Sequence, residues 1–378
     1  MKILSVVGVR PNIIKFVAWS RAIAKFQQQY AIEHIIVHSG QHYDDAMFHH
    51  LWKTFELPDI QYRLNVGSGS HAWQVGMMMI ELEKVLMVEN PDWVVAIDDV
   101  NTALATGITA KKMNFKLAHI EAGLRSFDKS MPEEHNRILV DHVSDLLFVP
   151  DQQSFDKLLA EGIDIKNIKL TGNFMADTLW QSISKAGHCD IHDTISKYAL
   201  STNEIKLTNY ALFTLHRPSN IQEEHTLKKI IQFLINDWGG KTDYIIWPVH
   251  PGVLKKLKET KLFEALLKAS GHIILLQPVN YFEMLQLTSH ASFVLTDSGG
   301  LQEETSILGI PCVTMRENTE RPITLKENGG TNVLVGNDIN KMDQSCKQAM
   351  NCVGVKNNIP YWEGNAAERG LISLFAMK

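Results

Sequence analysis

The sequence predicts two doubly wound α/β domains, each built on a parallel sheet. Apolar, β-branched runs alternate along the chain with helical stretches, and a less apolar segment separates them into two series. Continuous apolar strands that alternate with helices are typical of parallel sheets covered on both faces. The runs end in polar or charged residues in both series, and 378 residues are enough for two such domains.

The runs mark the expected strands in chain order. The first series is ILSVVG (3–8), HIIVHSG (34–40), WVVAIDD (93–99), LAHIEAG (117–123), LLFVP (146–150) and IKLTGN (168–173). The second is ALFTLHRP (211–218), YIIWPVHP (244–251), HIILLQP (272–278), FVLTDSGG (293–300) and PCVTMR (311–316). Between Gly172 and about Tyr210 the alternation is interrupted, so we expect the domain boundary there. The tail at 365–377 predicts a last amphipathic helix, which could pack on either domain.

The overall composition favours a small ligand. A formal net charge of -5 gives no electrostatic reason to expect nucleic acid or an anionic membrane as a partner. Cys189, Cys312, Cys346 and Cys352 have neither the spacing of a zinc site nor that of a disulfide framework. The apolar run at the N-terminus is too short for a signal peptide, so a cytoplasmic location is expected.

Polar residues follow almost every predicted strand. In open α/β sheets ligands bind at the carboxyl ends of the strands, so these residues form a candidate site. They are Arg10, Gln41, His42, Asp98, Asp99, Glu121, His216, Arg217, His250 and residues 297–300. Any one of them could cap a helix or satisfy a structural hydrogen bond. Because a purely structural sheet does not need so many, the set favours a cleft between two domains.

Two helix starts allow both a structural and a functional interpretation. In LTDSGGLQEE, residues 295–304, Ser298 could cap a helix, or Ser298 and the two glycines could bind a phosphate at the helix N-terminus. Pro132 predicts a helix start whose apolar face comprises Leu139, Val143, Leu146 and Leu147. Glu133 lies four residues before Arg137, which is the spacing of an ordinary surface pair.

Several common catalytic motifs are absent from the sequence. The first predicted strand is followed by GVRPNIIK rather than by G-x-G-x-x-G, and no G-x-x-x-x-G-K-[ST] motif occurs. Neither H-E-x-x-H nor G-x-S-x-G is present. Nicotinamide-dependent redox chemistry, P-loop phosphotransfer, zinc hydrolysis and serine-nucleophile catalysis are therefore disfavoured.

The motifs taken together resemble those of the non-hydrolysing UDP-N-acetylglucosamine 2-epimerases. In order from Arg10 to about Gly336 they are GVRPNIIK, SGQHYDD, IDDVNTALA, HIEAGLRSFDKSMPEEHNRI, TGN followed by Asp177, TLHRPSN, PVHP, LTDSGGLQEE, MRENTERP and GGTNVLVG. The resemblance implies a GT-B-like fold of two Rossmann-type domains facing a central cleft. Residues 1–173, with a C-terminal helix at about 360–378, would form the first domain. Residues 174–359 would form the second, UDP-binding domain.

The resemblance also implies roles for individual residues. Ser298, Gly299 and Gly300 would hold the diphosphate, and Glu304 the ribose hydroxyls. Arg10, Lys15, His216 and Arg321 would contact the nucleotide or its phosphates, and Val279 and Met284 would lie at the uracil. Asp99, Glu121 and Glu133 match catalytic acids and bases, with His216 beside the leaving phosphates. Resemblance further implies a homodimer whose product serves a cell-surface polysaccharide.

The chemistry of the family accounts for these carboxylates. No carbonyl group acidifies the hydrogen on C2 of an N-acetylhexosamine, so the family eliminates UDP across C1–C2 and adds it back after protonation on the opposite face. Such a route needs two proton-transfer groups and cations at the diphosphate, and we expect neither a metal nor a redox cofactor. We expect Glu121 or Glu133 to abstract the proton and Asp99 to assist in protonation or orientation.

Three departures from the family pattern keep alternatives open. Asp98-Asp99-Val100 replaces the usual Gly-Asp-Thr, which adds a carboxylate that could retune the acid/base pair or signal a different sugar. Pro218-Ser219 replaces the common Arg-Glu. HAWQVGMMM, residues 71–79, lacks the polar pattern of members with a second, activating UDP-sugar site, although Gln41, Arg217 and His250 could line one.

The nearest alternative function is the same elimination chemistry on another UDP-2-acetamido sugar, such as a 2,3-diacetamido uronic acid or a deoxy-hexosamine. Hydrolysis of the glycal and GT-B glycosyl transfer are more distant enzymatic alternatives. A UDP-sugar-binding regulator without turnover is the alternative from a different class. A pure binder would not need Asp99, Glu121, Glu133 and His216 together.

Overall fold

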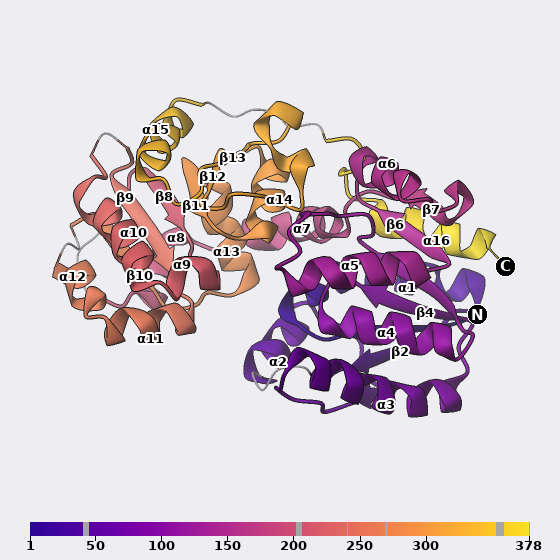
Figure 1. The fold of residues 1–378 in the computed structure, drawn as a ribbon. Coiled ribbons are helices and arrows are strands. Elements are labelled where there is room, and N and C mark those ends of the chain that lie inside the picture. Colours follow the sequence, from indigo (N-terminus) through magenta and orange to yellow (C-terminus); the bar gives the residue numbers. More distant parts are fainter. Residues whose placement is uncertain (41–44, 202–205, 240, 269–270, 353–358, 378) are drawn as a thin grey trace. The chain divides into compact units, whose positions relative to one another are not determined.

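The computed structural model describes residues 1–40, 45–201, 206–239, 241–268, 271–352 and 359–377, without the side chains of residues 10, 11 and 45–47. The chain divides into two compact units, and the division falls within one helix. The first unit comprises Met1–Gln181 and Pro360–Lys378, and the second comprises Ser182–Ile359. Each is an α/β unit with one parallel sheet (Figure 1), which confirms the predicted fold class.

The first unit contains a seven-stranded sheet in the order β3-β2-β1-β4-β5-β6-β7. Its strands are β1 (Lys2–Val7), β2 (Glu33–His38), β3 (Tyr62–Arg63), β4 (Trp93–Ile97), β5 (Lys116–Ile120), β6 (Leu146–Val149) and β7 (Ile168–Leu170). The strand order reverses between β1 and β4. Ligands collect at such a switch point in doubly wound sheets.

Helices cover both faces of the first sheet. They are α1 (Arg10–Tyr30), α2 (Asp45–Thr54), α3 (His71–Glu89), α4 (Asn101–Lys112), α5 (Pro132–Val143), α6 (Gln152–Ala160), the short η1 (Ile165–Asn167), α7 (Phe174–Ala186) and α16 (Ala366–Ala376). On one face, Leu82 of α3, Ala103 of α4 and Val140 of α5 belong to a buried cluster with alternate strand residues such as Val94. Trp19 of α1 is also fully buried and donates its indole N–H to Ser5 of β1.

The second unit contains a six-stranded sheet in the order β10-β9-β8-β11-β12-β13. Its strands are β8 (Tyr210–Phe213), β9 (Tyr244–Pro248), β10 (Ile273–Leu276), β11 (Phe293–Thr296), β12 (Cys312–Thr314) and β13 (Asn332–Leu334). Its helices are α8 (Ile191–Tyr198), α9 (Pro218–Ile221), α10 (Glu224–Asn236), α11 (Pro251–Glu259), α12 (Leu262–Lys268), α13 (Tyr281–Ser289), α14 (Gly299–Leu308), η2 (Pro322–Thr324), η3 (Lys326–Asn328) and α15 (Ile339–Met350). Here the order reverses between β8 and β11.

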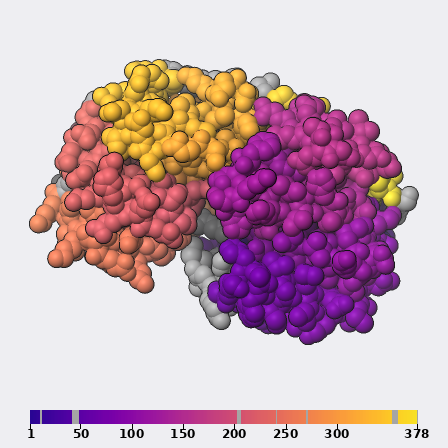
Figure 2. Space-filling view, viewed as in Figure 1, coloured from indigo at the N-terminus to yellow at the C-terminus, as the bar shows by residue number. Residues whose placement is uncertain are grey.

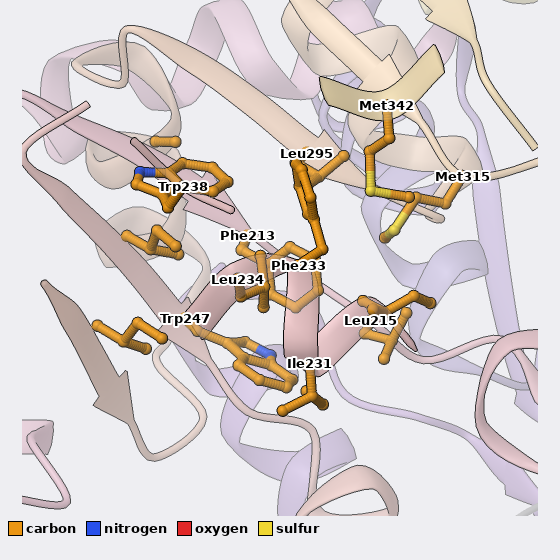
Figure 3. Packing of buried hydrophobic residues seen from close by; sticks show 14 of the residues in the cluster. Phe213, Leu215, Ile231, Phe233, Leu234, Trp238, Trp247, Leu295, Met315 and Met342 are labelled. Atoms are coloured by element: carbon orange, nitrogen blue, oxygen red, sulfur yellow. The ribbon is translucent and has the colours of Figure 1, made fainter. Parts of the chain in front are cut away.

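Alternate residues of the second sheet enter two separate cores. Phe213 and Trp247 pack at 4.6 Å between ring centroids, edge to face, in a cluster with side chains of α10 and α15 (Figure 3). Their neighbours Leu212 and Ile246 point to the other face and join side chains of α8, α13 and α14. Burial on both faces explains why the strands read as continuous apolar runs.

Each of the eleven predicted runs contains a strand, but part of one predicted helix is wrong. Helix α5 ends at Val143, and Leu146 and Leu147 lie in β6 instead. Leu139 is 47% exposed, so it does not belong to an apolar face. The buried side of α5 carries mostly polar residues, which no apolar periodicity could have revealed.

The C-terminal segment packs on the first unit. Asp177 of α7 accepts hydrogen bonds from the backbone N–H groups of Ala366 and Ala367 at the start of α16. Tyr30 of α1 stacks on Phe375 at 4.2 Å between ring centroids. Figure 2 shows the yellow C-terminal residues against the magenta surface of this unit. No described helix is both long and apolar enough to cross a bilayer.

Candidate functional site

In the first unit, Asn12 joins the two sides of the switch point. Its side-chain oxygen accepts the backbone N–H groups of Gly8 and Val9, at 3.3 and 3.2 Å. Its amide nitrogen donates to the carbonyl of Ile97 and to Asp98 Oδ2, both at 3.3 Å. The first turn of α1 is thereby fixed to the end of β4. The side chain of Arg10, which the sequence singled out, lies outside the described residues.

Lys15 lies between two carboxylates that follow neighbouring strands. Its Nζ is 2.7 Å from Asp98 Oδ2 and also contacts Glu121 Oε2. The exposed fractions of Lys15, Asp98 and Glu121 are 1%, 5% and 8%. A buried charge is tolerated only with a partner, so the ammonium and the two carboxylates stabilise one another.

Asp98 and Glu121 both have left-handed backbone conformations, with φ of 69° and 72°. This conformation costs a non-glycine residue about 1 kcal/mol, although Asp tolerates it better than most. The backbone of Asp98 is held at both ends. Its N–H donates to Ile120 O at 3.1 Å, and its carbonyl accepts from His119 Nε2 at 2.9 Å.

Asp99 is bound by a buried arginine. Arg137 donates to Asp99 Oδ2 from Nε at 2.9 Å and from Nη2 at 2.6 Å, and its Nη1 donates to Glu134 at 2.6 Å. The prediction of a surface pair between Glu133 and Arg137 is therefore wrong. Arg137 is only 3% exposed, because Asp99, which follows β4, and Glu134 of its own helix bind it inside the unit.

The two consecutive glutamates of α5 have different environments. Glu134 is buried and accepts the backbone N–H groups of Ser126 and Phe127. Burial opposes its ionisation, but these N–H groups, the Ser126 hydroxyl and Arg137 outweigh burial and hold the pKa of Glu134 below its ordinary value. Glu133 is half-buried, and its side chain makes no hydrogen bond or ion pair with any residue that the structure describes.

A buried hydrogen-bond network, which the sequence analysis did not single out, supports the ends of β4 and β5. His119 Nδ1 lies 2.7 Å from Asp141 Oδ1, and Asp141 Oδ2 accepts from Gly123 N and Arg125 Nη1. Burial disfavours the charged imidazole, but Asp141 outweighs burial and raises the pKa of His119. Both ring nitrogens face acceptors, which fits a protonated ring. The one sequence feature that pointed to this network is that His119 and Arg125 lie in the HIEAGLRS motif.

In the second unit, His216 and Asp297 meet at the switch point between β8 and β11. His216 Nδ1 is 2.8 Å from Asp297 Oδ1. Asp297 also accepts the backbone N–H groups of His216 and Arg217 and the amide of Asn220. Burial opposes ionisation of Asp297, but these donors outweigh it and lower its pKa. The carboxylate orients the half-exposed imidazole, whose Nε2 is left for other contacts.

Helix α14 begins at the end of β11 with a serine cap and a close backbone approach. Ser298 Oγ accepts the Leu301 N–H at 3.4 Å, so the capping interpretation is confirmed. A β-carbon on Gly299 would lie 2.8 Å from Glu320 Oε1 and 3.1 Å from Arg321 Nη1. Glycine therefore lets the guanidinium of Arg321 approach the helix N-terminus. Gly300 follows in the same first turn.

Charged groups of both signs surround this helix start. Arg321 Nε is 2.7 Å from Glu303 Oε2, and Arg321 Nη1 contacts Glu320 Oε1. Arg316 Nη2 is 2.6 Å from Glu320 Oε2. The next carboxylate of α14, Glu304, is 8% exposed. The sequence singled out Arg321 and Glu304 but not Glu303 and Glu320, which bind Arg321, although both lie in the motifs LTDSGGLQEE and MRENTERP.

The remaining candidate residues of the second unit also follow strands. Val279 comes after β10 and is buried, and Met284 on α13 packs against the same cluster. His250 caps α11 by accepting Gly252 N–H at 3.2 Å. Arg217 precedes α9. Gln41, the third residue proposed for a second site, lies outside the described residues, as does His42.

Comparisons with known proteins agree with the resemblance found in the sequence. A family model described as UDP-N-acetylglucosamine 2-epimerase matches residues 24–374. The UDP-N-acetylglucosamine 2-epimerase of Methanocaldococcus jannaschii is 40% identical over 98% of this chain and 97% of its own length. The UDP-2,3-diacetamido-2,3-dideoxy-D-glucuronate 2-epimerase of Pseudomonas aeruginosa is 35% identical over 98% of each chain.

A solved structure covers the whole chain. It is the crystal structure of the M. jannaschii UDP-GlcNAc 2-epimerase in complex with UDP-GlcNAc and UDP, with a TM-score of 0.87, 38% identity and complete coverage of both chains.

Proposed function

The chain belongs to the UDP-N-acetylglucosamine 2-epimerase family, and from this premise we propose that it interconverts UDP-N-acetylglucosamine and UDP-N-acetylmannosamine. The observation that carries the proposal is the set of carboxylates at the ends of β4 and β5, in a chain that matches the family over nearly its whole length. Glu121 and Asp99 follow these adjacent strands, and each is bound to a buried cation. Inversion at C2 requires such proton-transfer groups.

We propose that the reaction proceeds by elimination and re-addition. Glu121 or Glu133 takes the C2 proton while the electrons of the C2–H bond form a C1–C2 double bond and the C1–O bond breaks, releasing UDP and a 2-acetamidoglucal. A proton then adds to the opposite face of C2, and a UDP phosphate oxygen re-forms the bond to C1. Asp99 assists this protonation or orients the sugar. No atom or electron is gained overall.

The second unit supplies the proposed nucleotide site. The N-terminus of α14 favours an anion, and Ser298, Gly299, Gly300 and Arg321 lie there to receive the diphosphate. His216, oriented by Asp297, would stabilise the leaving phosphates. As the resemblance implies, we also propose Glu304 at the ribose, Val279 and Met284 at the uracil, and Arg10 at the phosphates. The implied phosphate contact of Lys15 is not part of this proposal, because its ammonium is bound to Asp98 and Glu121.

A second candidate is the same chemistry on another UDP-2-acetamido sugar. The P. aeruginosa relative, named for a diacetamido uronate, is 35% identical, which supports this alternative. Asp98, which replaces the usual glycine beside Asp99, is the departure from the family pattern that motivates this alternative. The regulator without turnover is the less favoured reading, because the chain has Asp99, Glu121, Glu133 and His216 together, and a pure binder would not need these proton-transfer groups.

Proton NMR in deuterated water tests the proposal. Purified protein is incubated with UDP-N-acetylglucosamine, with no added metal or nicotinamide. We expect UDP-N-acetylmannosamine carrying deuterium at C2. Conversion of a 2,3-diacetamido uronate alone would support the second candidate, and UDP binding without any C2 exchange would support the regulator.

We further propose that the chain acts as a homodimer and that helix α3 contributes to the contact. Trp73, Ile80, Met87 and Val88 of this helix are between 46% and 74% exposed. Large apolar side chains grouped on one element are typical of an interaction surface. The cytoplasmic location and the role in cell-surface polysaccharide synthesis stay predictions from the sequence.

A further inference from the structure

We propose that Asp98 is a positioning residue for the reaction, which acts through Lys15 to hold the carboxylate of Glu121. This inference rests on the proposed function and deepens it. The glycine that the family usually has at this position could not perform this role, because the role requires a side chain that reaches Lys15. Asp98 has that side chain despite its left-handed backbone.

The sheet places the two carboxylates side by side. Ile97 of β4 pairs with Ile120 of β5, so Asp98 and Glu121 are the next residues on neighbouring parallel strands. Both leave their strands through a left-handed turn, and both side chains reach Lys15 on α1. Three different elements therefore meet at a single buried ammonium.

Asp98 is anchored through both its backbone and its side chain. Its backbone is bonded to Ile120 and His119, and its Oδ2 also accepts from Asn12 at 3.3 Å. Lysine has a long, flexible side chain and a point charge that can move between acceptors. Because Asp98 is fixed on three sides, its carboxylate determines where the ammonium lies, and the ammonium in turn determines where Glu121 lies.

Small displacements of a proton-transfer group lower the reaction rate strongly. A shift of about 1 Å can lower a rate about 100-fold. Loss of the Asp98 charge would leave Lys15 with one fewer anchor, while the α14 site for UDP lies in the other unit and keeps its own contacts. Turnover should therefore fall with little change in nucleotide affinity.

Four variants test the inference: Asp98→Asn, Lys15→Met, the double variant and the control Asp145→Asn. Asp145 also binds a lysine in the first unit, Lys111, at 2.7 Å, but it precedes β6 at the opposite end of the sheet, where it accepts from Leu117 N of β5. The readouts are kcat and KM for C2 exchange, the UDP dissociation constant from calorimetry, and the rate at which acetic anhydride labels each lysine, measured by mass spectrometry.

We expect Asp98→Asn to lower kcat by about 10- to 100-fold, with KM and the UDP dissociation constant within about threefold of the wild type. The double variant should be no slower than Lys15→Met, because the two residues act as one unit. Acetic anhydride should label Lys15 faster in Asp98→Asn than in the wild type. In Asp145→Asn it should label Lys111 faster and Lys15 at the wild-type rate. The control should keep wild-type kcat.

Three outcomes would overturn the inference: a wild-type kcat in Asp98→Asn, additive losses in the double variant, or an unchanged labelling rate of Lys15. A wild type that binds UDP but exchanges no C2 hydrogen in any UDP-sugar would instead overturn the proposed function. The labelling comparison then still decides whether Asp98 holds Lys15.

Discussion

At the residue scale, adjacent glutamates at the start of α5 are suited to different tasks. Glu134 is enclosed by donors and held ionised, as its lowered pKa indicates. A carboxylate that accepts so many hydrogen bonds is a poor proton acceptor, but it stabilises the local structure. The Glu133 side chain makes no such contacts with the described residues, and it is the member of the pair to which we assign a role in proton transfer.

We therefore expect opposite consequences from two matched substitutions. Glu133→Gln should lower the rate of C2 exchange at least about 100-fold, because general acid–base groups contribute about 10²- to 10⁴-fold, and should leave the unfolding free energy nearly unchanged. Glu134→Gln should lower the unfolding free energy by about 2 kcal/mol, because buried donors lose their charged acceptor. Urea denaturation and the NMR exchange assay measure the two effects.

The Glu133→Gln and Glu134→Gln variants are controls for each other. Equal losses of stability in both variants would show that Glu133 has a structural role instead. Full turnover in Glu133→Gln would remove this residue from the mechanism and leave Glu121 as the candidate base.

At the element scale, attachment of α16 to the first unit should depend on pH. Asp177 caps this helix from α7, and burial raises its pKa to about 6 even though two backbone N–H groups oppose the shift. The folded chain thus binds this proton more tightly than the unfolded chain does. Linkage then requires that stability fall as pH rises from about 4 through the folded pKa of about 6, and level off near pH 7.

Asp177→Asn keeps an oxygen acceptor for the helix but has no charge. We expect its unfolding free energy to lose this pH dependence, so that relative to the wild type it gains up to about 3 kcal/mol between pH 4 and pH 7. Chemical denaturation at several pH values measures the difference. Asp156→Asn, which alters an exposed carboxylate on α6, is the control. Parallel stability curves for the wild type and Asp177→Asn would contradict the prediction.

The elements also show what local sequence can and cannot reveal. Strands buried on both faces read as apolar runs, so eleven of them follow from the pattern. β3 and β13 do not, because β3 has only two residues and Val333 in β13 is 36% exposed. Neither strand forms a continuous apolar run, and both lie at sheet edges.

The candidate site divides in the same way. Residues that follow strands could be located from the sequence, since parallel strands bring their carboxyl ends to one edge. The residues that bind them could not be located from the sequence. Arg137 was expected on the surface but is buried and bound by Asp99, and Asp141 reaches His119, in both cases from another element. Such contacts depend on tertiary packing, which local spacing does not encode.

At the scale of the whole molecule, helix α3 has more apolar surface than its own unit covers. One side is buried through Met78, Leu82 and Leu86, whereas Ile80 and Met87 remain exposed. Exposed large apolar side chains grouped on one helix are typical of an interaction surface. A second copy of the chain is the partner that the family resemblance implies.

The double substitution Ile80→Glu with Met87→Glu should therefore dissociate the protein without unfolding it. Light scattering of the wild type at micromolar concentration should give about twice the chain mass of 42.7 kDa, and that of the variant the mass of one chain. Ile165→Glu, at a 62% exposed position in η1, is the control and should remain dimeric. A wild type with the mass of one chain would contradict the homodimer. A variant that stays dimeric would place the contact elsewhere, because two charges buried at an apolar interface without partners cost more than such a contact can supply.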